Sequence, residues 1–119
     1  MNAFVAHAGL ALLTLAALSG NAVADETAAE LARSKNCFSC HDLTHAGFGP
    51  SFQEVARRYR HLENADLMLA DEIKDGTNQH WALNKQWGSN PMPPSVVRAS
   101  TPVSEAEAKM LAQWVLQQP

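Results

Sequence analysis

The hydrophobic positions of residues 25–119 recur every three to four residues in short stretches, which is the spacing of one face of an α-helix. Valine and isoleucine, which strands favour, number only six in this region. No stretch alternates convincingly between apolar and polar residues, as a half-buried strand would. The pattern therefore predicts an all-α domain.

Residues typical of helix N-termini precede four of these stretches. Thr27 with Glu30, Ser51 with Glu54 and Ser104 with Glu107 have the spacing of a capping box, and Asn64 is a fourth candidate cap. We expect helices from about Ala28 to Asn36, from Ser51 to about Arg60, from Asn64 to a stop at Gly76, and from Ser104 onward. The side chains expected to face inward are Leu31, Ala32, Phe52, Val55, Ala56, Tyr59, Leu69, Ile73, Ala108, Leu111, Ala112, Trp114, Val115 and Leu116.

A long stretch from Thr77 to Val103 has no periodicity and contains four prolines, Pro91, Pro93, Pro94 and Pro102. A structureless connection of this length is uncommon in a small domain unless it is functional or wraps something. The region after residue 24 is also poor in apolar residues, and a domain of this size often needs a disulfide, a metal or another staple. Both features predict that a ligand fills the centre of the fold.

The N-terminal residues have the pattern of a secretory signal peptide. An apolar run from Val5 to Leu18 is followed by the small-residue triplet Ala22-Val23-Ala24. We expect cleavage between Ala24 and Asp25, which leaves residues 25–119 as one domain in the periplasm. The run is shorter than the roughly 20 apolar residues of a spanning helix, so an uncleaved anchor is the alternative and stable membrane insertion is not expected.

The charge of the chain excludes one class of partner. Its formal net charge is −3, and nucleic-acid binding proteins usually carry a basic surface on a basic domain. The tight basic cluster of Arg57, Arg58 and Arg60 is typical of a solvated helix face. We therefore expect no binding to nucleic acid.

The candidate chemistry lies in Cys37-Phe38-Ser39-Cys40-His41. Two thiols separated by two residues can each add to a vinyl group of one haem, and the histidine that follows then faces the iron. This spacing predicts haem c, one group attached through Cys37 and Cys40, with His41 as the proximal ligand. A zinc site would need a second pair of ligands, and a thioredoxin-like pair would need a βαβ context.

The second axial ligand must come from elsewhere in the chain. The candidates are Met68, Met92, Met110, His45, His61 and His80. Met68 and Met110 fall in expected helices, where methionine usually fills the core. Met92 lies among three prolines that restrain the backbone, which suits a ligand better than a core side chain. We therefore expect Met92 as the ligand, with His80 as the main rival.

Five motifs occur in one order along the chain: Cys37–His41, Gly49-Pro50, Trp87-Gly88, Pro91–Pro94 and the segment from Leu111 to Val115. In this order and near these spacings they resemble small bacterial class I cytochromes c of the c551/c552 type. The resemblance covers essentially all of residues 28–117. It implies a compact cytochrome c fold of four to five short helices around one covalently bound haem with histidine and methionine ligands.

The resemblance also implies roles for residues around the haem. The carbonyl of Pro50 would accept the Nδ1–H of His41, and the indole N–H of Trp87 would be donated to a haem propionate. Glu72 stands where close relatives often have an arginine near a propionate, a role open to Lys85 or to a neutral Glu72.

Two further departures lie in the segment from Asn78 to Val103. Ser95 replaces a frequent asparagine that hydrogen-bonds the methionine sulfur in the family. Residues Asn78–Lys85, including His80 and Trp81, resemble an insertion relative to the shortest members.

Function follows from the two axial ligands. An iron with both positions filled has no open site for O₂, peroxide or nitrite, but it still changes valence. We expect a soluble, monomeric one-electron carrier, not an enzyme, that docks transiently on respiratory partners such as a reductase, an oxidase or a bc1-type complex. Docking would use an apolar patch near Cys37 and Phe38. The alternatives are a haem-containing enzyme subunit and a gas-binding sensor with a displaceable sixth ligand.

Overall fold

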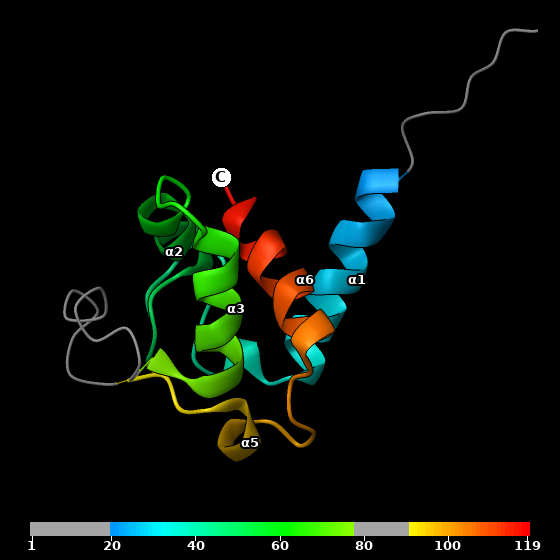
Figure 1. Cartoon of the computed structure of the whole chain (residues 1–119), viewed down its shortest axis with the longest axis vertical. Coiled ribbons are helices and arrows are strands. Elements are labelled where there is room, and N and C mark those ends of the chain that lie inside the picture. Colours follow the sequence, from blue (N-terminus) through cyan, green and yellow to red (C-terminus); the bar gives the residue numbers. More distant parts are fainter. Residues whose placement is uncertain (1–19, 78–90) are drawn as a thin grey trace, which may run out of the picture.

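The computed structural model describes residues 20–77 and 91–119, which form helices and loops without a strand (Figure 1). The all-α prediction is therefore confirmed. The helices are α1 (Gly20–Ser34), the 3₁₀ turn η1 (Cys37–Ser39), α2 (Phe52–Tyr59), α3 (Ala65–Asp75), α5 (Ser95–Arg98) and α6 (Glu105–Leu116).

Helix α6 is the centre of the fold, because it packs against α1, α2 and α3, while α5 packs against the end of α3 (Figure 1). Its buried face has the predicted stripe of Ala108, Leu111, Ala112 and Val115, and Trp114 is buried beside it. The other buried apolar side chains are Ala28, Ala32, Phe52, Ala56, Tyr59, Ala65, Leu69, Ala70 and Val103. Leu31, Val55, Ile73 and Leu116 are half-buried and pack against this core.

Serine caps begin two of the helices as predicted. The hydroxyl of Ser104 accepts from the backbone N–H of Glu107 at 3.3 Å, and the Glu107 carboxylate accepts from the N–H of Ser104 at 2.8 Å. Ser51 accepts from the N–H of Glu54 at 3.1 Å, while the Glu54 side chain pairs with arginines of α2. These bonds satisfy N–H groups that have no partner within the helix.

Two predicted helix starts are wrong in detail. Helix α1 begins at Gly20, well before Ala28, because the alanine-containing residues that precede Thr27 can also be helical and make Thr27 an interior residue. Asn64 precedes α3 as expected, but it has a left-handed backbone (φ 57°) and its side chain makes no capping bond. Gly76, at φ 85°, ends α3 as predicted.

Helix α5 lies inside the stretch predicted to be irregular. The Pro94 carbonyl accepts from the N–H groups of Val97 and Arg98, at 3.0 and 3.4 Å, and one turn forms. A single turn has no hydrophobic periodicity, so the sequence pattern does not reveal it.

Met110 is exposed, so its predicted role as a core side chain is wrong. Its side chain falls outside the buried stripe of α6 and 42% of the residue is exposed, whereas Met68 is half-buried. His45 and His61 are exposed as well. The long apolar run at residues 5–18 and His80 lie outside the described residues.

Candidate functional site

A cavity of about 370 Å³ brings together residues that are distant in the sequence. It is lined by side chains of α2, α3 and α6, by Cys37, Cys40 and His41 on one segment, by Pro50, and by Met92 on another. Five of the six predicted site residues therefore surround one cavity. The sixth, Trp87, lies outside the described residues, as do Trp81 and Lys85.

The two cysteines are held by the turn η1. The N–H groups of Cys40 and His41 both donate to the carbonyl of Cys37, at 3.2 and 3.0 Å. Asn36, just before the turn, has a left-handed backbone (φ 61°) that turns the chain out of α1. Neither thiol is in a disulfide, and both line the cavity. Both sulfurs are therefore available to a group in the cavity.

The imidazole of His41 is fixed in orientation by two neighbours. Its Nδ1 lies 2.6 Å from the carbonyl oxygen of Pro50. A carbonyl can only accept, so Nδ1 donates the proton and Nε2 keeps a lone pair for a metal. The ring also stacks on Phe52, with centroids 5.2 Å apart and planes at 24°.

Burial lowers the pKa of His41, and the positive charge of Arg98 lowers it further, while the bond to Pro50 opposes both. These influences together leave the pKa below its ordinary value, so the ring is neutral at neutral pH. A neutral imidazole is the form that ligates a metal.

Burial raises the pKa of the Cys37 thiol, an effect that Arg98 partly offsets.

Gly49 leaves room for the His41 ring. A Cβ atom at residue 49 would lie 2.6 Å from Cε1 of His41 and 2.9 Å from its Nδ1. The N–H of Gly49 also donates to the carbonyl of Cys40 at 2.8 Å, which keeps this backbone close to the ring. Glycine is therefore required here by close approach, which the sequence alone did not predict.

Both the carbonyl and the N–H of Met92 are hydrogen-bonded to Thr77. The carbonyl of Met92 accepts from the N–H of Thr77 at 3.1 Å, and the N–H of Met92 donates to Oγ1 of Thr77 at 2.8 Å. Gly76 makes this approach possible, because a Cβ there would lie 2.7 Å from the Met92 carbonyl oxygen. The end of α3 therefore positions Met92.

Met92 is the one predicted axial candidate among the described residues that lines the cavity. Met68, Met110, His45 and His61 do not line it. His80 is outside the described residues, so the choice between Met92 and His80 rests on the restrained backbone of Met92.

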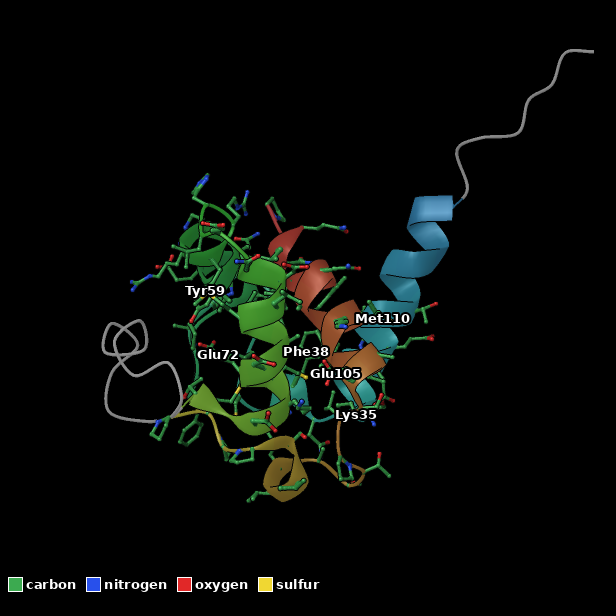
Figure 2. All side chains as sticks on the ribbon, viewed as in Figure 1. Lys35, Phe38, Tyr59, Glu72, Glu105 and Met110 are labelled. Carbon is green, nitrogen blue, oxygen red and sulfur yellow. The ribbon has the colours of Figure 1, made fainter. Side chains whose placement is uncertain are left out.

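A carboxylate faces the cavity from α3. Glu72 is only 4% exposed, and both of its oxygens accept from the hydroxyl of Tyr59, at 3.1 and 3.0 Å. The two side chains lie together between α2 and α3 (Figure 2). Glu72 therefore sits in the cavity wall, at the position where the family resemblance implied an arginine.

Ser95, which stands where the family often has an asparagine that bonds the methionine sulfur, bonds a different segment of the chain. The side chain is almost completely buried, and its Oγ accepts from the backbone N–H of Val103 at 3.2 Å. It therefore fastens the start of α5 to the segment before α6.

These residues fit a covalently attached haem. The cavity offers two thiols on one turn, an imidazole with a free ring nitrogen, a thioether on a second segment, and walls that are mostly apolar. Among the side chains that the structure describes, no three His, Cys, Asp or Glu residues are arranged so that they could hold a metal ion by themselves.

Comparison with known proteins identifies the family. The family model for cytochrome c matches residues 26–119, so the chain belongs to the cytochrome c family. Cys37 and Cys40 form its CXXC haem-binding motif, and the chain is a small electron carrier of the c551/c552 type, not an enzyme.

Its relatives include cytochrome c-552 of Hydrogenobacter thermophilus, which is 39% identical over 88% of this chain and 92% of the relative. Cytochrome c-551 of Azotobacter vinelandii is 43% identical over 76% of this chain and 96% of the relative. The crystal structure of Nitrosomonas europaea cytochrome c552 superposes with a TM-score of 0.64 at 36% identity, covering 76% of this chain and 99% of that one.

Proposed function

We propose that the protein is a periplasmic one-electron carrier of a respiratory chain, with His41 and Met92 as the axial ligands of its haem iron. The observation that carries the proposal is that both residues line one cavity. Hydrogen bonds hold the ring of His41 to Pro50 and the backbone of Met92 to Thr77. The similarity to cytochromes c-551 and c-552 supports the same role.

The residues around the cavity are suited to electron transfer in which no external molecule binds to the iron. Haem, when bound, supplies a one-electron iron couple, and methionine with histidine ligation raises its potential. Pro50 and Phe52 hold the His41 ring, while Thr77 holds Met92. With both side chains held in this way, a change of valence at the iron would require little rearrangement of the protein.

Visible spectra of the purified holoprotein test this proposal. The oxidised protein is expected to show a sulfur-to-iron charge-transfer band, and the reduced protein is expected to leave its spectrum unchanged under CO. A missing band or ready CO binding would instead support the alternative of a sensor or enzyme subunit with a displaceable ligand.

We propose that redox partners, such as a reductase, an oxidase or a bc1-type complex, dock at the mouth of the cavity. Phe38, near which the docking patch is expected, is half-buried, and its ring packs on Phe52 and Trp114 with centroids 5.4 and 6.3 Å apart. Phe48 lines the cavity and is 84% exposed, which makes it the better apolar contact. Electron-transfer complexes are typically small and transient, so we expect weak binding by a monomer.

We propose that residues 1–24 are a signal peptide that directs residues 25–119 to the periplasm. The supporting observations are the apolar run and the triplet before Asp25. No helix in the described part of the chain is long and apolar enough to cross a membrane. The intact mass of protein purified from its source is expected to correspond to a chain beginning at Asp25 with one haem added. A mass that retains Met1 would contradict cleavage.

A further inference from the structure

The side chain of Arg98 joins three separate segments around the cavity. Its Nε donates to the carbonyl of Pro93 at 3.2 Å, its Nη1 to the carbonyl of Lys35 at 3.4 Å, and its Nη2 to the carbonyl of Ile73. Pro93 directly follows Met92, and Lys35 lies two residues before Cys37. The guanidinium, which is half-buried and lines the cavity, therefore connects the methionine segment to the haem-attachment segment and to α3.

Further bonds tie the same segments together. The Asn36 side chain donates to the carbonyl of Arg98 at 3.2 Å. The ammonium of Lys35 donates to Oγ1 of Thr101 at 3.2 Å and to the carbonyl of Pro102 at 3.1 Å. Residues 98–102 are therefore bonded on several sides to the two residues that precede Cys37.

Thr77 and Arg98 both hold the segment of Met92, but they bond it to different parts of the fold. Thr77 bonds Met92 to the segment at the end of α3. Arg98 bonds the residue after Met92 to the segment that carries Cys37 and His41, so it restrains the distance between the two ligand-bearing segments. A planar guanidinium can serve three acceptors in different directions, which a lysine ammonium on a flexible stem does not reproduce.

We propose that Arg98 is a positioning residue that keeps the Met92 segment closed over the haem iron. The inference rests on the proposed ligation by Met92. Without its three bonds, the segment would open more often, and the iron position proposed for Met92 would become accessible to outside ligands. The role depends on hydrogen bonds to carbonyls and not on the charge alone.

Imidazole binding to the oxidised holoprotein measures this opening, because imidazole takes the iron position that Met92 leaves. The variants are Arg98→Gln, which removes the charge and most bonds, and Arg98→Lys, which keeps the charge. Arg60→Gln and Arg60→Lys are matched controls. Arg60 also bonds two carbonyls, those of Ala56 and Gln118 at 3.1 and 2.6 Å, but it does not line the cavity.

Both Arg98 variants are expected to bind imidazole at least about tenfold more tightly than the wild type, which corresponds to about 1.4 kcal/mol. The Arg60 variants are expected to match the wild type. The free energy of unfolding of all four variants is measured with a denaturant, in order to separate local opening from a general loss of stability. If Arg98 had a merely structural role, imidazole affinity would rise only in proportion to the stability lost. If Arg98→Gln yields no holoprotein, the two lysine variants decide the question.

Equal imidazole affinity in the Arg98 and Arg60 variants would overturn the inference. The inference would also be overturned if Arg98→Lys bound imidazole as weakly as the wild type while Arg98→Gln bound it more tightly. That result would show that the charge alone is responsible. A wild type without the sulfur-to-iron band would overturn the proposed ligation itself, which is a separate result.

Discussion

Replacing Met92 with alanine is expected to convert an electron carrier into a haem protein that binds external ligands. The substitution removes the thioether from the cavity, while Pro91, Pro93 and Pro94 restrict the backbone from bringing in another donor. The reduced variant should bind CO, its oxidised form should lose the sulfur-to-iron band, and its reduction potential should fall, since methionine ligation raises the potential. Visible spectra with and without CO, and a potentiometric titration, measure these three effects.

Two other methionines provide the controls for this experiment. Met68→Ala is expected to cost less than the roughly 2–5 kcal/mol of a fully buried methionine, because Met68 is half-buried. Met110→Ala is expected to change the free energy of unfolding by less than about 0.5 kcal/mol, since Met110 is exposed. Both should retain the band and exclude CO. A Met92→Ala protein that also retains the band would show that another residue is the ligand.

Replacing both Cys37 and Cys40 with alanine is expected to leave a largely unfolded chain. Without the haem, the mostly apolar cavity of about 370 Å³ between the helices would be left unfilled. A small domain has only roughly 5–15 kcal/mol of total stability, so it cannot easily tolerate losing the group that completes its core. The far-ultraviolet circular dichroism of the double variant should therefore show little helix.

The single variants Cys37→Ala and Cys40→Ala are the matched comparison, because each keeps one attachment point. They are expected to retain haem and most of the helical signal. An apo-protein of the double variant with native-like helicity would contradict the idea that the bound group completes the core.

Features that depend on a few consecutive residues were predictable from the sequence. The caps at Ser51 and Ser104 and the stop at Gly76 are local, and the structure has all three. The haem-attachment motif is also local, because the two thiols and the histidine must share one short segment. The central cavity was predictable from the shortage of apolar residues together with the long proline-rich stretch.

Features that depend on distant contacts were not predictable in the same way. Gly49 belongs to one of the motifs of the family resemblance, but its φ is not positive, and the reason for a glycine there is seen only where the His41 ring approaches it. Arg98 is an ordinary surface-type residue in the sequence, and its three acceptors lie on segments up to 63 residues away. The start of α1 was misplaced because local capping at Thr27 competes with good helix formers before it.

The extension of α1 back to Gly20 gives the proposed cleavage a second effect. In the full chain, α1 has no acidic residue in its first turn, and the bond between Ala24 and Asp25 lies within the helix. Cleavage there would place Asp25 and Glu26 at the new N-terminus, where carboxylates interact favourably with the helix dipole and offset the new α-amino charge. Thr27 and Glu30 would then stand near a helix start, where a capping box can form. Removal of residues 1–24 would thus replace a helix start that has no acidic residue in its first turn with one that has carboxylates and a possible capping box.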